Sequence, residues 1–488
     1  MKTKFDILIV GAGIAGLSQA LSLAEKEPTL KIGVISKSKL QETNTRMAQG
    51  GIAAVMSTQK DSYINHIEDT IKASQNKANA QVVKYVVEHA HDGIHQLENW
   101  GVKFDHFKNK YHLGLEGGHS KARILHVKDQ TGAAVHDQLI AELSKHPSIT
   151  VFEYSEVIEL LLSETKEIAG AVLYNYEEKS TRILTAKIIV LATGGMGQVF
   201  QYTTNSSIAS GDGIALAKNI GAEISNLKSI QFHPTAFKEQ DKKQMFLISE
   251  AVRGAGAYVI NENEERFLFK YDPRAELATR DIVSAAIYQE LKNTATKNVY
   301  LDCRHFAKEV LENEFPYIYN YCLKAGYDLL QQAIPITPAA HYSCGGIQVD
   351  INGKTNVPQL YAIGECANTG LHGNNRLASN SLLEAIVFTK NMTESIVKEL
   401  PKVTFQTLIK KSLNSLQLEH NSFDKINELR QQLRIQLTAY FIQKTEKEKK
   451  SLQELLLKCK NELKQLPTQE LDVIHFKWHF DLVEELMV

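Results

Sequence analysis

The fold of this chain is decided by FDILIVGAGIAG, residues 5–16. The apolar run 7–10 predicts a buried strand, and Gly11, Gly13 and Gly16 follow it. This spacing permits a tight turn, a close approach of the backbone to a pyrophosphate, and close packing of the next helix on the strand. The helix would then direct its free N–H groups and partial positive charge at the phosphates. The stretch therefore predicts a dinucleotide site.

The residues that follow complete a strand–turn–helix–strand unit but depart from its usual pattern at one point. KIGVIS, residues 31–36, has the composition of a second strand. An acidic residue that binds ribose hydroxyls is expected near the end of that strand, whereas the chain has Ser36 and Lys37 there. Taken alone, the glycine motif is also compatible with a turn that binds no nucleotide.

Two further apolar strands run into glycine far along the chain. IIVLATGG contains Thr193, Gly194 and Gly195, and LYAIGE ends at Glu365. Taken singly, Gly195 or the glycine before Glu365 is equally compatible with a turn in a packed sheet. Together the three sites predict an α/β fold with an FAD-binding Rossmann-like domain assembled from separate segments.

Composition places the chain among soluble enzymes. Its 488 residues suffice for two or three domains. A net charge of -1 gives no indication of a nucleic acid or an anionic membrane as partner, and no apolar run reaches transmembrane length. The five cysteines form no CxxC pair, which favours reduced thiols and argues against zinc or an iron–sulfur cluster. We expect a cytoplasmic enzyme without a bound metal.

The pattern along the chain predicts four segments. Residues 1–226 alternate strands with helices and form the first part of the FAD-binding domain. Within them, residues 150–162, 170–175 and 183–193 predict strands, and the apolar spacing of 80–99 predicts a helix. Residues 227–341 interrupt this alternation as an inserted α+β capping domain, and 342–402 return to the FAD-binding domain. Residues 403–488, rich in Leu, Lys, Gln and Glu, predict a C-terminal helical domain.

Polar motifs that combine glycine with histidine or arginine are the candidates for chemistry. They are MAQGG (47–51), LEGGHS (115–120), QFHPT (231–235), SEAVRG (249–254), TRDI (279–282), HYSCGG (341–346) and GNNRLASNSLLE (373–384). In this order, over about residues 5–395, they resemble the succinate dehydrogenase/fumarate reductase flavoprotein family. The resemblance implies a flavin domain, a mobile cap, a C-terminal helical domain, and a substrate held where the cap meets the flavin domain.

The resemblance also assigns positions that contact FAD. Membrane-complex succinate oxidisers carry a histidine for covalent flavin attachment five places before the Gln of MAQGG, where this chain has Asn44. We therefore expect noncovalent FAD, with Glu365 holding the ribityl hydroxyls. The implied cofactor positions are Gly11, Ala12, Gly13, Ile14, Ala15, Gly16, Lys37, Asn44, Thr45, Arg46, Met47, Ala48, Gln49, Gly50, Gly51, Val157, Ile158, Thr193, Gly194, Asp212, Glu365, Ser381 and Leu382.

A second set of positions matches a dicarboxylate site. His233, Ser249, His341 and Arg376 correspond to the groups that bind the carboxylates. An arginine fork suits this task because it binds a carboxylate through two parallel hydrogen bonds. Taken singly, either histidine is also compatible with a structural role, and Arg376 with a surface cation.

Three further positions match the catalytic machinery of the family. Arg280 corresponds to the arginine that donates or accepts the proton, and Glu250 with Arg253 to the relay behind it. An arginine is hardly ever neutral, so this role suits proton donation to a developing carbanion better than proton removal. Glu250 and Arg253 are also compatible with a buried ion pair that holds the cap.

Glu116 is the position at which the resemblance distinguishes between two classes of substrate. Succinate-oxidising relatives have FGGQS where this chain has EGGHS, and the carboxylate of Glu116 can pair with an α-ammonium group. Cys344 also separates this chain from the membrane-complex relatives, which tend to have Met at that position. The implied reaction is oxidation of L-aspartate to iminoaspartate, with O2 or fumarate reoxidising the flavin. The product would pass to quinolinate synthase in NAD biosynthesis.

Two alternatives stay open, and the resemblance weakens near the C-terminus. The chain could be a soluble fumarate reductase or succinate-oxidising flavoprotein, or a noncatalytic flavin-binding relative. Beyond residue 403, the aromatic and arginine-rich helix of the family is replaced by a segment in which Arg430 and Arg434 are spaced to share one helix face. Glu116 could also be a surface acid in a glycine loop.

Overall fold

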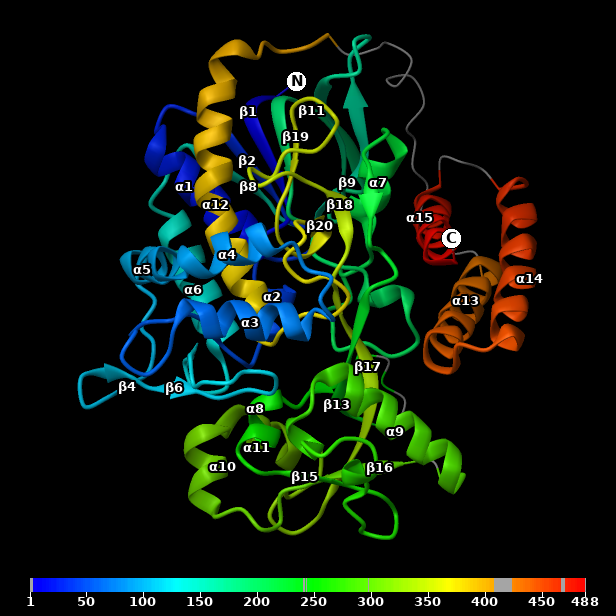
Figure 1. The fold of residues 1–488 in the computed structure, drawn as a ribbon. Coiled ribbons are helices and arrows are strands. Elements are labelled where there is room, and N and C mark those ends of the chain that lie inside the picture. The colour runs from blue at the N-terminus through cyan, green and yellow to red at the C-terminus, as the bar shows by residue number, and fades with distance from the viewer. Residues whose placement is uncertain are drawn as a thin grey trace.

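The computed structural model describes residues 3–239, 242, 244–296, 298–407, 424–466 and 470–487 (Figure 1). A seven-stranded sheet with the order β8-β2-β1-β11-β10-β9 forms its centre, and β19 pairs with β11. The strands β8, β2, β1, β11 and β19 are parallel to one another, whereas β10 is antiparallel to both of its neighbours. Their bounds are β1 (Thr3–Val10), β2 (Ile32–Ile35), β8 (Ile149–Phe152), β9 (Ser155–Leu162), β10 (Ile168–Asn175), β11 (Ser180–Leu191) and β19 (Leu360–Ala362).

Strand β1 is buried on both faces, as its apolar sequence predicts. Successive side chains of a strand point to opposite faces. Ile7 and Ile9 accordingly belong to one hydrophobic core, whereas Leu8 and Val10 belong to another on the other side of the sheet. A parallel sheet needs such cover on both faces, because each face is apolar.

Different helices cover the two faces. The core around Ile7 includes residues of α1 (Ile14–Lys26), α4 (Ala80–Glu88), α5 (Ala90–Asn99), α6 (Thr131–Leu143) and α12 (Asn380–Glu399). The opposite core includes residues of α7 (Asp212–Asn219) and of three C-terminal helices, α13 (Asp424–Gln443), α14 (Glu446–Leu463) and α15 (Leu471–Met487). Figure 1 shows the two groups on opposite sides of the sheet.

A second lobe lies below the main sheet in Figure 1 and has a hydrophobic core of its own. Its five-stranded sheet has the order β14-β13-β17-β16-β15. The strands are β13 (Ile230–Phe237), β14 (Phe246–Leu247), β15 (Tyr258–Ile260), β16 (Val299–Asp302) and β17 (Ile334–Ser343). The helices are α8 (Glu250–Gly254), α9 (Arg280–Thr294), α10 (Lys308–Glu314) and α11 (Pro316–Lys324). The fold class predicted from the sequence is confirmed, while the exact domain boundaries stay a prediction.

Short strands form three further small sheets. Short sheets join β3 (Ile52–Ala53), β7 (Ile124–Leu125) and β6 (Leu113–Gly114), then β12 (Ile224–Ser225), β18 (Gly346–Gln348) and β20 (Ala367–Asn368), and finally β4 (His106–Phe107) and β5 (Lys110–Tyr111). In sequence, helix α2 (Asn44–Met47) precedes β3, and helix α3 (Tyr63–Ala73) follows it.

Two predicted elements are divided in the structure. Residues 150–162 form β8 and β9 rather than one strand, because the chain turns at Tyr154, which has a φ of 49°. The two halves pair with different partners, β8 with β2 and β9 with β10. The helix predicted over 80–99 is interrupted at His89, which ends α4 and precedes α5.

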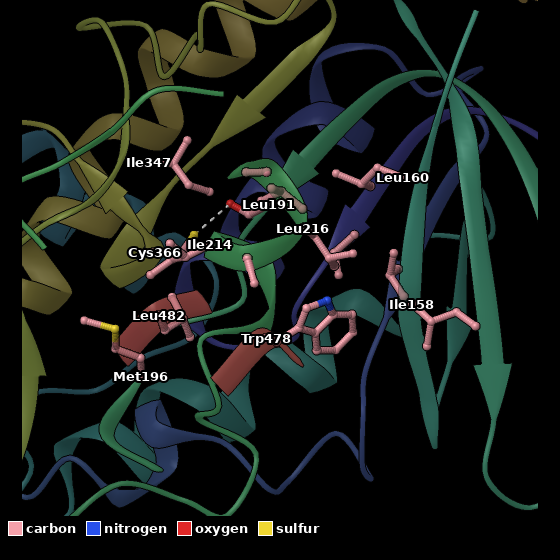
Figure 2. Packing of buried hydrophobic residues seen from close by; sticks show 14 of the residues in the cluster. Ile158, Leu160, Leu191, Met196, Ile214, Leu216, Ile347, Cys366, Trp478 and Leu482 are labelled. Atoms are coloured by element: carbon pink, nitrogen blue, oxygen red, sulfur yellow. Dashed lines mark hydrogen bonds between the residues drawn. The ribbon is translucent and has the colours of Figure 1, made fainter. Parts of the chain in front are cut away.

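The C-terminal helices pack on the sheet rather than extending from it. Trp478 and Leu482 of α15 contact the same buried cluster as Ile158 of β9 and Leu216 of α7 (Figure 2). Arg434 donates to the Gln198 carbonyl at 2.8 Å, which ties α13 to the same domain. Residues 408–423, 467–469 and 488 of the predicted helical domain lie outside the described residues. Within the described part of the chain, no helix is long and apolar enough to cross a membrane.

Candidate active site

The turn between β1 and α1 is built for a close approach of a ligand to the backbone. Gly11 has a φ of 117°, and a Cβ atom there would lie 2.1 Å from the Ala192 carbonyl oxygen. A Cβ atom on Gly16 would lie 2.0 Å from the Gly11 oxygen, so α1 can pack on the strand only without a side chain. Gly13 is the N-cap of α1 and has no side chain to cover the helix end, while the Ile14 N–H donates to the Thr45 hydroxyl at 2.9 Å. This end of α1 therefore fits a phosphate group.

A continuous cavity begins at this turn. It encloses about 1570 Å³ of empty space, its open mouth included. Most of the positions predicted for FAD line it: Gly11, Ala12, Gly13, Ile14, Ala15, Lys37, Asn44, Thr45, Met47, Ala48, Gln49, Gly50, Gly51, Val157, Thr193, Gly194, Asp212, Glu365, Ser381 and Leu382.

Three predicted FAD positions do not line the cavity. Gly16 acts through helix packing, and Ile158 is buried in the core behind β9. Arg46 points away and pairs with Asp137, with both side chains partly exposed. Asn44 does line the cavity, and its side-chain oxygen accepts a hydrogen bond from the Ser206 N–H at 2.8 Å.

Lys37 occupies the place where the nucleotide fold usually has an acid. Its ammonium lies 2.6 Å from Asp212 Oδ2 and 2.8 Å from Glu156 Oε1, and both carboxylates line the cavity. Burial alone would lower the pKa of Lys37, but these carboxylates raise it well above its usual value. The acidic groups missing at the end of β2 are therefore supplied by β9 and α7. Sequence reasoning missed Glu156, although an acid inside an otherwise apolar strand was a usable signal.

Histidine and arginine side chains gather where the cavity meets the second lobe. His233 on β13 and His341 on β17 have ring centroids 5.0 Å apart. The Thr235 N–H donates to His233 Nδ1 at 3.3 Å, so the neutral ring carries its proton on Nε2. Burial, together with the charge of Arg280, holds the pKa of both histidines well below the usual value. His233 is therefore a neutral donor at a buried position.

Gln231 joins the two arginines of the site. Its Oε1 accepts from Arg280 Nη1 at 3.0 Å and from Arg376 Nη2 at 3.3 Å. The amide cannot be reversed, because its NH2 group donates to Asn375 Oδ1 and to the Arg376 carbonyl, each at 2.7 Å. Arg376 also lies over the Tyr342 ring, and burial lowers its pKa to about 10. Sequence reasoning had noted the QFHPT motif without assigning Gln231 a role.

The three residues predicted to form a proton relay lie next to one another in the structure. Arg280 Nε donates to Glu250 Oε2 at 2.6 Å, and Arg253 Nη2 lies 2.9 Å from Glu250 Oε1. Burial would raise the pKa of Glu250, but Arg280 and Arg253 lower it below its ordinary value. Arg280 and Glu250 line the cavity, whereas Arg253 lies behind them and donates to the Glu276 carbonyl. A buried carboxylate thus separates the two guanidinium groups.

Ser249 links this lobe to the loop predicted to contact the flavin. Its N–H donates to Gln49 Oε1 at 3.0 Å, and the Gln49 amide donates to the Leu247 carbonyl at 2.5 Å. The Ser249 hydroxyl lies at the first turn of α8, where it accepts from the Ala251 N–H. His341 is fixed separately, because its Nδ1 lies 2.7 Å from the hydroxyl of Thr204.

Glu116 is buried on the wall of the same cavity and is not a surface acid. Only 5% of it is exposed, and the Ser379 hydroxyl donates to its Oε2 at 2.6 Å. Burial raises the pKa of Glu116 above its usual value. A Cβ atom on Gly50 would lie 2.7 Å from Glu116 Oε1, so the absence of a side chain there makes room for the carboxylate beside the flavin loop. Cys344 is buried but does not line the cavity.

A buried ion cluster holds the loop that carries Glu116. Arg123 donates to both oxygens of Asp61, at 2.7 and 3.0 Å, and to Asp69 at 2.6 Å. It also lies 2.8 Å from His119 Nδ1, which must therefore accept. His119 Nε2 then donates to the Ala378 carbonyl at 3.0 Å, next to the Ser379 that bonds Glu116. The neutral state of His119 agrees with burial, which lowers its pKa to about 4.

Comparison with known proteins gives a consistent result. Residues 6–382 match the family model of the FAD binding domain. The chain is 44% identical to L-aspartate oxidase of Yersinia pestis over 81% of this chain and 75% of that protein, and 42% identical to that of Vibrio cholerae over 82% and 76%. Among solved structures, it is similar to E. coli quinol fumarate reductase FrdA, with a TM-score of 0.88 and 29% identity over 100% of this chain and 89% of that one.

The fold, the glycine-lined cavity and the matching family model define the class of this protein as an FAD-dependent flavoprotein with a capping lobe. Within that class, the chain belongs to the L-aspartate oxidase family of the succinate dehydrogenase/fumarate reductase flavoproteins. The cofactor and the family predicted from the sequence are thereby confirmed. The roles of the individual site residues stay predictions.

Glu365 gives the site a pH dependence that can be measured. Burial raises its pKa from 4.5 to about 7, although the Ser343 N–H donates to its Oε1 at 2.9 Å. A group whose pKa is raised in the folded state contributes stability at low pH that is lost as the pH rises through that pKa. Between pH 5 and pH 8 we expect this group alone to lower the free energy of unfolding by about 2.5 kcal/mol.

Urea unfolding of the FAD-depleted full-length chain checks this expectation. Glu365→Gln has no ionisable group at this position, so its stability relative to wild type should increase by that amount between the two pH values. An equal stability difference at pH 5 and pH 8 would show that Glu365 titrates normally.

Proposed function

We propose that this chain oxidises L-aspartate to iminoaspartate in the cavity between the main sheet and the capping lobe. One observation carries the proposal: a buried carboxylate, Glu116, shares this cavity with Arg280, Arg376 and two neutral histidines. A dicarboxylate that also has an ammonium group matches such an arrangement of charges. The names of the relatives support the same substrate.

The arginines and histidines would bind the two carboxylates of the substrate. Arg376 is oriented by Gln231 and Ser381, and His233 has a donor nitrogen with no hydrogen-bond partner among the described residues. Hydrogen bonds to charged groups contribute roughly 1.5–3 kcal/mol each. Because these donors are already buried and held by neighbouring groups, little ordering is needed when the substrate binds.

Glu116 would bind the substrate ammonium and accept a proton from it. Its raised pKa favours proton uptake, and Ser379 leaves Oε1 as the oxygen available for the ammonium. FAD, when bound, would supply the redox chemistry: it can take up a hydride from the substrate Cα and pass the electrons on to O2 or fumarate. Arg280, replenished through Glu250 and Arg253, would donate the proton when fumarate is reduced.

The residues around the cavity support noncovalent FAD in the same proposal. Gly11, Gly13 and the start of α1 would hold the pyrophosphate, Glu365 would contact the flavin moiety, and Asn44 offers no covalent link. We also propose that the enzyme is cytoplasmic and passes iminoaspartate to quinolinate synthase for NAD biosynthesis. Residues 1–226 and 342–402 would form the FAD-binding domain, 227–341 the cap and 403–488 the helical domain.

A second candidate function is favoured by the solved structures. The similarity of this chain to quinol fumarate reductase makes succinate oxidation or fumarate reduction the main alternative. Succinate has no ammonium group, so this reaction would leave the buried carboxylate of Glu116 without a cationic partner from the substrate. A buried charge without a partner is costly, which favours the amino acid over succinate.

Anaerobic reduction of the bound flavin tests the proposal. We expect excess L-aspartate to bleach the flavin absorbance of the purified protein completely, and succinate in a parallel cuvette to leave most of it, because succinate has no ammonium group to pair with Glu116. Bleaching by succinate but not by L-aspartate would move the chain to the succinate/fumarate branch. If neither compound bleached a protein that contains FAD, the catalytic proposal would be wrong.

A further inference from the structure

Helix α15 reaches the back of the dinucleotide end of the cavity. His475 Nε2 lies 2.8 Å from Glu156 Oε2, and the other oxygen of Glu156 lies 2.8 Å from the Lys37 ammonium. A carboxylate only accepts, so the histidine nitrogen is the donor. Tyr176 also donates to Oε2 of Glu156. A chain of three side chains thus connects a C-terminal helix to an ammonium group on the cavity wall.

Helix α15 also packs against strand β9 and helix α7, which carry the two carboxylates beside Lys37. Trp478 is 4% exposed and lies with Ile158 of β9 and Leu216 of α7 in one buried cluster (Figure 2). Strand β9 carries Glu156, and α7 begins at Asp212, which is the second carboxylate that binds Lys37. Helix α15 therefore supports both elements that supply the partners of Lys37.

Glu156 depends on its partners because it is 1% exposed and ionised. Burial would raise its pKa, but His475 and Lys37 lower it below the ordinary range of a glutamate. Removing a donor from a buried carboxylate is costly, and the carboxylate would move or seek another partner. Either response would alter one of the contacts that orient the Lys37 ammonium, which also binds Asp212 at 2.6 Å and Ser210 at 2.9 Å.

We propose that His475 is a positioning residue for FAD. By donating to Glu156 Oε2 it would orient the carboxylate, and through it the Lys37 ammonium, at the cavity end formed with Ser36 and Asp212. The C-terminal helical domain would then be part of the cofactor site as well as a cover for the sheet. This inference rests on FAD binding and does not depend on the identity of the substrate.

Equilibrium dilution of the holoenzyme, followed by the fluorescence of released FAD, measures the relevant dissociation constant. We expect His475→Ala to raise the Kd about tenfold, the equivalent of one hydrogen bond to a charged group. His475→Gln keeps a donor of similar reach and should stay within about threefold of wild type. Lys477→Ala is the matched control, because Lys477 is exposed on the same helix.

A double-mutant cycle separates positioning from general destabilisation. If His475 acts through Lys37, His475→Ala should change the Kd by less than about twofold in a Lys37→Met background, because the two effects then share one path. A tenfold effect that persists in that background overturns the proposal, as does an unchanged Kd in the wild-type background.

Thermal unfolding of the FAD-depleted chains completes the test. Similar midpoints for His475→Ala and His475→Gln, with different Kd values, support positioning. A Kd that rises only in proportion to a lowered midpoint shows that His475 merely stabilises the fold. L-aspartate turnover is not the readout, so failure of the proposed reaction would leave this test intact.

Discussion

Replacing Arg280 by leucine is expected to abolish turnover while FAD remains bound. Arg280 lines the substrate end of the cavity and donates to Glu250 and Gln231, but it does not contact the glycine turn that would hold the pyrophosphate. Loss of a donor that stabilises charge in the transition state costs about 10²–10³-fold in kcat. Because Arg280 would also bind the substrate, we expect kcat/KM to fall by at least ~10³-fold.

The flavin absorbance of the purified variant and its steady-state kinetics check this prediction together. Glu250 would lose a buried partner, so the thermal midpoint must be compared with that of wild type. Arg274→Leu is a suitable control, since Arg274 is partly exposed, pairs with Asp272 and lies only six positions earlier. Turnover within tenfold of wild type in a folded, FAD-containing Arg280→Leu protein would remove Arg280 from the catalytic machinery.

Replacing Glu116 by glutamine is expected to separate the two reactions of the site. The amide keeps the size of the side chain and can accept from Ser379, but it has no charge for the substrate ammonium. Removing one partner of a buried charge pair costs roughly 2–5 kcal/mol, so kcat/KM for L-aspartate should fall at least ~30-fold. Fumarate has no ammonium group, and its reduction should change by less than about fivefold.

Steady-state oxidation of L-aspartate and reduction of fumarate by the same preparation give the required ratio. Glu68→Gln is the matched control, because Glu68 is exposed on α3. Equal losses in both reactions would mean that Glu116 shapes the site without recognising the amino group. The buried network of Arg123 and His119 should remain intact in this variant, since it contacts the loop and not the carboxylate.

Local patterns were sufficient for much of the architecture. The alternating burial of β1, the turn at Gly11 and the strand that precedes Gly194 follow from residues close together in the chain. The same patterns did not reveal the turn at Tyr154. Its direction depends on pairing, because β8 adds to β2 while β9 adds to β10 at the other edge of the sheet.

Motifs located most of the candidate site, but the contacts between motifs were not visible in them. His233 and His341 are more than one hundred residues apart, and only the pairing of β13 with β17 brings their rings together. The role of Gln231 was hidden for the same reason. Its amide oxygen accepts from both Arg280 and Arg376, which are distant in the sequence. Side chains with long sequence separation meet only after the sheets have formed.

The sequence by itself determined the FAD-binding fold, because glycine spacing and strand periodicity are local constraints on the backbone. It also determined the family, since its polar motifs recur in a defined order. Only the tertiary structure decided that Glu116 is buried and that Glu156, rather than a residue of β2, supplies an acid beside Lys37. It alone joined His475 to that acid. Burial and charge pairing depend on every element packed around a group, and no local pattern contains that information.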